Sequence, residues 1–115
     1  MKSQEAIEQI HVIRYCEWRK IPVYHIPNGG KRNSKEAAHL KEQGVKPGVP
    51  DLCFPEARGG YHGLYIEMKS GKNKTTQNQK EWLELLGNNG YMTAVCYGSA
   101  EAIAVIDKYF NFERW

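Results

Sequence analysis

The sequence predicts an α/β fold in which a mixed central β-sheet is flanked by α-helices. Residues 63–69 alternate apolar and polar side chains, which is typical of a strand with one buried face. A second short strand precedes them across a glycine-containing turn, and both ends of the chain carry apolar residues at helical spacing. With 115 residues, of which 41% are hydrophobic, we expect a single domain over residues 1–115.

The N-terminal segment predicts a helix followed by a strand. The helix is expected from about residue 3 to 19, with Ser3 as its N-cap. Glu5 and Glu8 lie in its first turns, where acidic side chains suit the helix dipole. The strand is expected over residues 21–26.

A loop with two glycines and two cations follows this strand. Backbone amides that can approach a ligand, together with basic side chains, are what a phosphate contact requires. The candidates for such contacts are Asn28, Lys31 and Arg32. The alternative is a solvated glycine turn. A short helix over residues 34–43 is then expected, with Ser34 as its N-cap.

The centre of the chain predicts a hairpin of two strands, over residues 49–54 and 63–69. Pro50 belongs at the first residues of its strand, because proline lacks an amide donor. In the second strand one face is apolar and carries Leu64, Ile66 and Met68. The opposite face carries Glu67, so Asp51 and Glu67 can lie side by side.

Asp51 and Glu67 predict a site for a divalent cation. Two adjacent carboxylates repel each other, and a hard cation prefers oxygen ligands. Asp51, Glu67 and the main-chain carbonyl of Met68 form a plausible set of ligands for Mg²⁺ or Mn²⁺. Lys69, on the same face, would hold or deprotonate a water molecule or offset negative charge in a transition state. The alternative is an aspartate at a turn and a surface Glu-x-Lys pair.

A basic loop follows Lys69 and contains Lys72 and Lys74, which are further candidates for phosphate contacts. The alternative for both is ordinary surface charge. Gly71-Lys72 does not form a nucleotide-binding loop, because the Walker pattern requires glycine where Ile66 stands. We therefore expect no nucleotide cofactor.

The remaining elements are a helix, a strand and a last helix. The first of these helices is expected over residues 76–88, where Thr76 and Gln79 match a capping box. Its side chains expected to face the core are Trp82, Leu83, Leu85 and Leu86. Residues 91–97 predict a strand, and Ser99 is expected to cap the final helix.

An ordered set of motifs resembles the PD-(D/E)XK nuclease superfamily and, more narrowly, its VRR-NUC (virus-type replication-repair nuclease) domain. The set comprises Gly48-Val49-Pro50-Asp51-Leu52, then Ile66-Glu67-Met68-Lys69, then Gln79, Trp82 and Gly90-Tyr91. Further matches are Glu5-x-x-Glu8-Gln9, residues 26–32 and Gly44-Val45-Lys46. The resemblance covers nearly the whole chain.

The resemblance implies a stand-alone, metal-dependent DNA endonuclease of phage or bacterial type with a restriction-endonuclease-like core. It implies that Asp51, Glu67, Lys69 and Gln79 are catalytic, and that Asp51, Glu67 and Met68 bind Mg²⁺ or Mn²⁺ with a glutamate of the first helix. The family spacing of Glu-x-x-x-Gln selects Glu5 for that role, with Glu8 as a close rival. The candidate DNA contacts are Asn28, Lys31, Arg32, Lys72 and Lys74.

Branched DNA such as a four-way junction is the substrate that the resemblance suggests. Symmetric cutting of a junction needs two active sites, so a homodimer is expected. A nuclease acting on flaps or linear duplex stays open, as does a non-catalytic module that binds junctions. Retention of Asp51, Glu67 and Lys69 together argues against the last.

Composition excludes several other classes of protein. The three cysteines are widely spaced, which supports neither a disulfide framework nor a zinc site, and we expect them to be small buried residues in a reducing cytoplasm. No apolar run suggests a membrane segment or a signal peptide. The four histidines show no ligand spacing and are expected to be surface or core polar groups.

Overall fold

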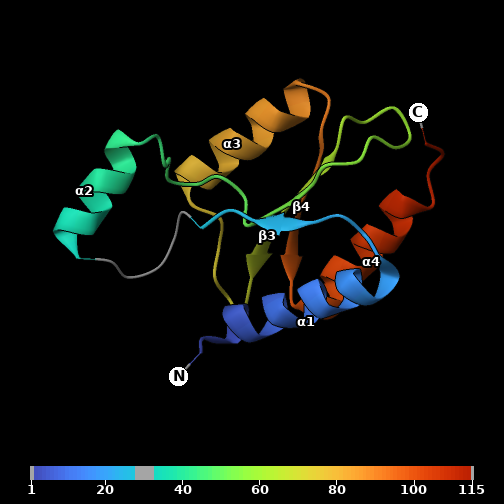
Figure 1. Ribbon diagram of the computed structural model, residues 1–115, viewed down its shortest axis with the longest axis horizontal. Coiled ribbons are helices and arrows are strands. Elements are labelled where there is room, and N and C mark those ends of the chain that lie inside the picture. The colour runs from blue at the N-terminus through green and yellow to red at the C-terminus, as the bar shows by residue number, and fades with distance from the viewer. Residues whose placement is uncertain (1, 28–32, 115) are drawn as a thin grey trace.

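The computed structural model describes residues 2–27 and 33–114, which form a four-stranded sheet covered by helices on both faces. The elements, in order, are α1 (Gln4–Arg19), β1 (Tyr24–His25), α2 (Ser34–Glu42), β2 (Leu52–Phe54), β3 (Leu64–Lys69), α3 (Gln77–Asn88), β4 (Met92–Tyr97) and α4 (Ser99–Phe110). Helices α1 and α4 lie together on one side of the sheet and α3 lies on the other (Figure 1). No helix in the described residues is both long and apolar enough to span a bilayer. The predicted α/β class is confirmed.

The sheet is mixed and has the strand order β1-β2-β3-β4. Strands β1 and β2, and β2 and β3, are antiparallel, whereas β3 and β4 are parallel. Leu52 pairs with Ile66 across β2 and β3. Continuing this register by one residue brings Asp51 opposite Glu67, as the hairpin predicted.

The core lies between the sheet and the pair α1 and α4. The apolar face of β3 is fully buried there, which confirms the predicted alternation. Its partners are Leu52 and Phe54 of β2, Val12 and Cys16 of α1, and Ala102, Ile106 and Tyr109 of α4. All three cysteines are free and buried, as expected from their spacing.

Two strands are shorter than predicted. Strand β1 covers only Tyr24–His25, because the Ile21 amide donates to the carbonyl of Cys16 at the end of α1 (2.8 Å) and Pro22 has no amide to donate. Strand β2 begins at Leu52 rather than at residue 49. The residues just before β1 connect it to the end of α1, and those just before β2 belong to the preceding loop.

Helix α3 begins as predicted, with Thr76 as its N-cap. Of the four side chains predicted to face the core, the prediction for Leu85 is wrong. Leu85 is 50% exposed. Because successive helical residues are rotated by about 100°, Leu85 points away from the side of α3 on which Leu86 is buried.

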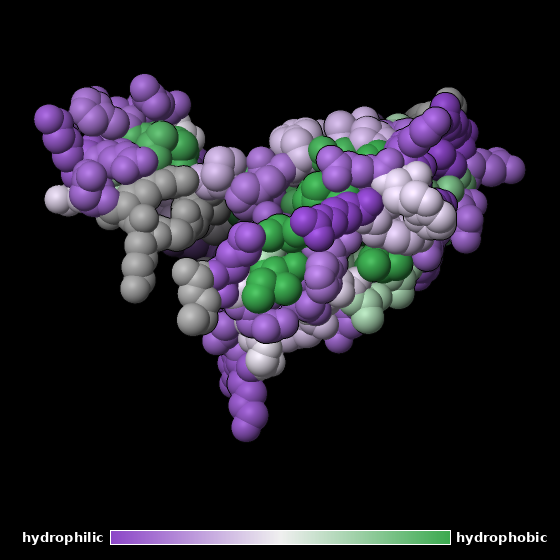
Figure 2. All heavy atoms as spheres, turned by 60° about the horizontal axis from the view of Figure 1, so that its bottom comes forward, coloured by the Kyte–Doolittle hydropathy of each residue, from purple (hydrophilic) through white to green (hydrophobic). Residues whose placement is uncertain are grey.

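Helix α2 stands apart from the rest of the described chain (Figure 1). It has no buried residue, and none of its Cα atoms lies within 8 Å of a Cα atom of the other described helices or strands. In Figure 2 it forms a mainly hydrophilic lobe set off from the body of the molecule. Its N-cap is Asn33, whose side chain accepts from the amide of Glu36 (2.7 Å), and not Ser34 as predicted.

Candidate active site

A cavity of about 360 Å³ lies where β3 ends, between the layer of α1 and the layer of α3. The end of β3, the residue before β2, the first two turns of α1 and the first turn of α3 all reach it. Its lining includes Glu5, Asp51, Glu67, Met68, Lys69 and Gln79. The structure therefore brings the predicted catalytic and metal-ligating residues to one place.

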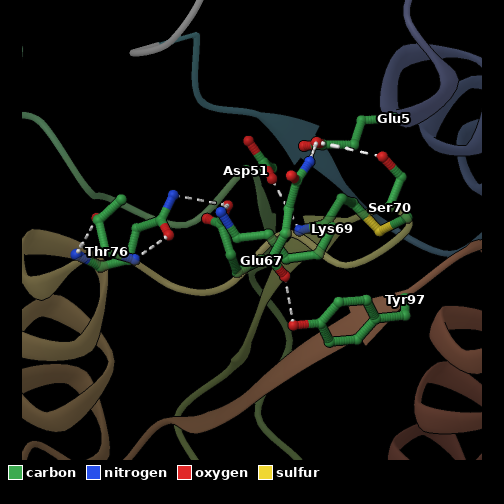
Figure 3. A network of polar contacts seen from close by, with 10 residues as sticks. Glu5, Asp51, Glu67, Lys69, Ser70, Thr76 and Tyr97 are labelled. Atoms are coloured by element: carbon green, nitrogen blue, oxygen red, sulfur yellow. Dashed lines mark hydrogen bonds and ion pairs between the residues drawn. The ribbon is translucent and has the colours of Figure 1, made fainter.

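Asp51, Glu67 and Lys69 point toward one another in this cavity (Figure 3). The carboxylate of Asp51 accepts a hydrogen bond from the main-chain amide of Met68 (2.7 Å), which ties the residue before β2 to β3. The ammonium of Lys69 lies 3.8 Å from Oε2 of Glu67. Glu67 is only 4% exposed and Lys69 only 7%, so both charged groups are largely removed from solvent.

Gln79 both completes the capping box of α3 and contacts a carboxyl group of the candidate site. Its side-chain Oε1 accepts from the main-chain amide of Thr76 (2.9 Å), and its main-chain amide donates to the Thr76 hydroxyl (3.2 Å). These two hydrogen bonds complete the capping box. Its Nε2 donates to Oε2 of Glu67 (3.1 Å). Because the cap fixes which end of the side-chain amide faces Thr76, the nitrogen is directed at Glu67.

Burial shapes the charges of the two central carboxyl groups. Burial and then the adjacent Asp51 raise the pKa of Glu67, Lys69 opposes both effects, and the net result is a pKa of about 8. Burial also raises the pKa of Asp51, against the hydrogen bond from the Met68 amide. Two adjacent carboxyl groups with raised pKa values attract a proton or a cation in preference to standing charged side by side.

The structure separates the two glutamates of α1. Glu5 lines the cavity, where Oε2 accepts from Ser70 Oγ (3.4 Å) and Asn73 Nδ2 (3.2 Å). Glu8 instead accepts from the amide of Ser99 (2.8 Å) and from its hydroxyl (3.3 Å). Ser99 was predicted to be the N-cap of α4, but the N-cap is Gly98, and Ser99 is the first residue of the helix. The carboxylate of Glu8 accepts from the amide at this helix end. Glu5 is the acid of α1 that faces the candidate site.

The oxygen donors suit a hard divalent cation held by a small number of protein ligands. Mg²⁺ binds through one or two carboxylates and keeps several waters, and Mn²⁺ also accepts carboxylate and carbonyl oxygens. Asp51, Glu67 and the carbonyl of Met68, which line one cavity, are the residues that could form such a set. Within residues 2–27 and 33–114, no group of three or more His, Cys, Asp or Glu side chains is close enough to hold a metal ion. Glu5 therefore does not complete a three-carboxylate cluster in this conformation.

The candidate phosphate contacts fall in two places. Lys72 and Lys74 are exposed on the loop between β3 and α3. The Tyr97 hydroxyl donates to the carbonyl of Asn73 between them (2.7 Å), and the Asn73 side chain donates to Glu5, so the loop is fastened beside the cavity. Asn28, Lys31 and Arg32 lie outside the described residues.

Comparison with known proteins agrees with this geometry. The profile of the VRR-NUC domain matches residues 3–100 of the chain. The chain belongs to the VRR-NUC family. A solved structure described as a VRR_NUC domain protein is 34% identical to it, with a TM-score of 0.84, and the match covers 99% of this chain and 93% of the other. No curated protein matches the chain. Membership makes this a nuclease-type domain, for which DNA is the suggested substrate.

Two further side chains reach the cavity of this VRR-NUC domain without having been predicted. His25 and Gln9 both line it. Nδ1 of His25 lies 2.9 Å from the main-chain carbonyl of Asp51 and 3.2 Å from the side-chain amide of Gln9. Since a carbonyl oxygen can only accept, Nδ1 donates to Asp51 in the tautomer that carries the proton on Nδ1, and in that tautomer the contact with Gln9 Nε2, itself a donor, is not a hydrogen bond. Gln9 lies one helical turn after Glu5, which was a usable signal; His25 depends on how β1 pairs with β2.

Proposed function

We propose that this chain is a Mg²⁺- or Mn²⁺-dependent DNA endonuclease that acts on branched DNA, with four-way junctions as its preferred substrate. The observation that carries the proposal is the burial of Glu67 and Lys69 beside the half-buried Asp51 at one cavity. Burial of a carboxyl group and an ammonium is unfavourable for stability unless each is closely paired. Such an arrangement is expected where it performs chemistry.

Asp51, Glu67 and the Met68 carbonyl would hold the ion, and Glu5 would add negative charge from α1. When bound, the ion would supply a Lewis acid for the phosphoryl group and lower the pKa of a water molecule. The proton on the carboxyl pair is displaced when the pair acts as a ligand, so we expect binding to strengthen as the pH rises toward 8.

Hydrolysis requires a water molecule to attack phosphorus while one phosphorus–oxygen ester bond breaks. The water gives up a proton, and the departing oxygen gains one to become a hydroxyl group. Lys69 is placed to orient that water or to offset the extra negative charge on the phosphoryl oxygens. Gln79 holds the Glu67 carboxyl group in position through Nε2.

The proposed assembly is a homodimer, because paired incision of a four-way junction needs two sites related by symmetry. Light scattering at micromolar concentration would measure the mass directly. A monomeric mass would contradict this part of the proposal while leaving the chemistry of the single site open.

The central test compares cleavage of labelled four-way junction, flap and linear duplex DNA in EDTA, Mg²⁺ and Mn²⁺. We expect metal-dependent, paired cutting of the junction. Lys69→Ala and Asp51→Ala should each reduce the rate by about 10³-fold or more, because each removes a group that acts on the reacting phosphate. Lys35→Ala, on the exposed surface of α2, is the matched control and should cut normally.

Circular dichroism of the same variants separates chemistry from folding. Loss of the fold in Lys69→Ala or Asp51→Ala would show that the residue is structural and would refute its assigned role. Cutting of flap or linear duplex in preference to the junction would overturn the substrate assignment. Binding of the junction without cleavage under any condition would identify a DNA-binding module instead.

His25 is expected to act through Asp51. His25→Ala should weaken Mn²⁺ binding and slow cleavage by about 10- to 100-fold, because the main chain of Asp51 loses a partner. His25→Asn should retain most of both, since an asparagine amide can donate from nearly the position of Nδ1. Calorimetric titration with Mn²⁺ in the absence of DNA measures the effect, with His39→Ala on α2 as the control. Equal losses in the Ala and Asn variants would contradict the positioning role.

A further inference from the structure

A second cavity, of about 460 Å³, opens on the face of the sheet that α3 covers. Its lining is mainly apolar and includes Ile26, Val45, Val49, Tyr65, Trp82 and Leu86. A volume of this size is in the range of cavities that bind small organic groups. None of the roles assigned above to the neighbouring carboxylate cavity uses it.

The two cavities share the same three segments of chain. Val49 precedes Asp51 by two residues, and Tyr65 precedes Glu67 by two residues on the same face of β3. Trp82 follows Gln79 by three residues on α3, which is about one helical turn. Each segment thus gives a polar residue to the carboxylate cavity and an apolar residue to the second one. Along β3 the step between them is about 7 Å.

The wall of the second cavity is held rigidly against this site. Gly48 packs on the first turn of α3 so closely that a Cβ atom there would lie 2.6 Å from the main-chain carbon of Asn78. This contact fixes the loop that carries Val49 and Asp51 against the helix that carries Gln79 and Trp82. A group bound in the second cavity would therefore have a defined position relative to Glu67.

Two aromatic rings give this cavity its chemistry. Trp82 and Tyr65 are both half-buried, so each keeps part of its ring accessible. Tyr65 is supported edge-on by Tyr91, with ring centroids 5.2 Å apart. Flat aromatic rings with few polar neighbours are suited to stacking with a nucleobase, whichever of the four bases it is.

We propose that this cavity is a nucleobase subsite, which receives one base displaced from the stack beside the phosphate at Glu67 and holds it against Trp82 and Tyr65. The inference rests on the proposed function and deepens it. Glu67 and Lys69 are largely buried, so a strand that leaves its regular helical path would bring its phosphate to them more easily than a regular duplex. Displacing a base costs least where stacking is already interrupted, as at a branch point. The subsite thereby gives a structural reason for selecting branched over linear DNA.

The experiment is a thermodynamic cycle that measures binding and requires no cleavage. Labelled four-way junctions carry a single abasic nucleotide at successive positions around the crossover, and their affinity is measured by fluorescence polarisation in EDTA. For the wild type, we expect one position at which the abasic junction binds about 10-fold more weakly than the intact junction. Trp82→Leu should bind the intact junction about 10-fold more weakly and show no further loss at that position.

Two variants keep the result interpretable. Trp82→Phe retains a ring and should restore the dependence on the base, which a merely misfolded helix would not allow. Leu85→Ala alters the exposed side of the same helix outside this cavity and should bind all junctions like the wild type. Thermal unfolding of each variant verifies that the fold is retained.

The inference is overturned if no abasic position depends on Trp82, or if Trp82→Leu changes the mass of the protein in light scattering, which would make the cavity a contact between subunits. Failure of the proposed function is distinguishable from either result. If the wild type shows the dependence on Trp82 but cuts no DNA, the subsite stands in a junction-binding module. If the wild type cuts junctions without that dependence, only the subsite is refuted.

Discussion

Glu67→Gln is expected to abolish DNA cleavage and, in the same protein without metal, to increase its stability. Glutamine cannot supply the anionic oxygen that a divalent cation requires, so the rate should fall by about 10³-fold or more. Glutamine also has the shape of the protonated glutamate and can still accept from Gln79. At pH 8.5 in EDTA the free energy of unfolding should rise by about 2 kcal/mol.

The gain should depend on pH in a specific direction. The pKa of Glu67 is raised in the folded protein to about 8 from an ordinary value of 4.5, so the unfolded chain loses this proton first as the pH rises. The free energy of unfolding of the wild type should therefore decline between about pH 4.5 and pH 8, and the difference from Glu67→Gln should vanish near pH 4. Urea denaturation at both ends of this range measures it. A Gln variant that is less stable at pH 8.5 would contradict the assigned burial of the carboxyl group.

Gly48→Ala is expected to be the most destabilising of the conservative glycine substitutions, with a loss of about 2–5 kcal/mol in the free energy of unfolding. Gly48 has a φ of +90°, and an added Cβ would also lie 2.6 Å from the main-chain carbon of Asn78. The helix α3 would have to shift, and Gln79 would move relative to Glu67. Cleavage should therefore fall together with stability, as urea denaturation and the junction assay would measure.

Gly60→Ala is the matched control for this result. Gly60 has a φ of +92° but nothing lies within 4 Å of an added Cβ, and it lines neither cavity, so only the backbone conformation is strained. Its expected cost is about 1–2 kcal/mol, and cleavage should remain normal. If the two variants lose equal stability, the contact with Asn78 contributes nothing and the rigid wall between the two cavities is not supported.

The hairpin and the residues of its polar face were predictable because strand periodicity acts locally. Leu64, Ile66 and Met68 turn inward by alternation, and this places Glu67 and Lys69 together on the other face. The capping box of Thr76 and Gln79 was likewise visible as a local pattern. That Gln79 also reaches Glu67 depends on where α3 packs, which no local pattern contains.

The features missed are those decided by contacts between distant segments. The sequence favoured Glu5 over Glu8, but it did not show that Glu8 lies outside the cavity, which depends on α4, whose first amide donates to Glu8. His25 meets Asp51 only because β1 adds to the edge of β2. The exposure of Leu85 likewise reflects which side of α3 faces the sheet, and helical periodicity alone did not distinguish it from Leu86.

Because α2 stands apart, the part of this chain that folds cooperatively does not include every helix. Residues 34–42 bury no side chain, and a nine-residue helix has little stability in water without tertiary contacts. The free energy that holds this segment helical is thus nearly independent of the core formed by the sheet, α1 and α4, and the segment can open while the rest remains folded. Substitutions in α2 would be tolerated by the fold, and its sequence is left to be shaped by whatever it meets outside the domain.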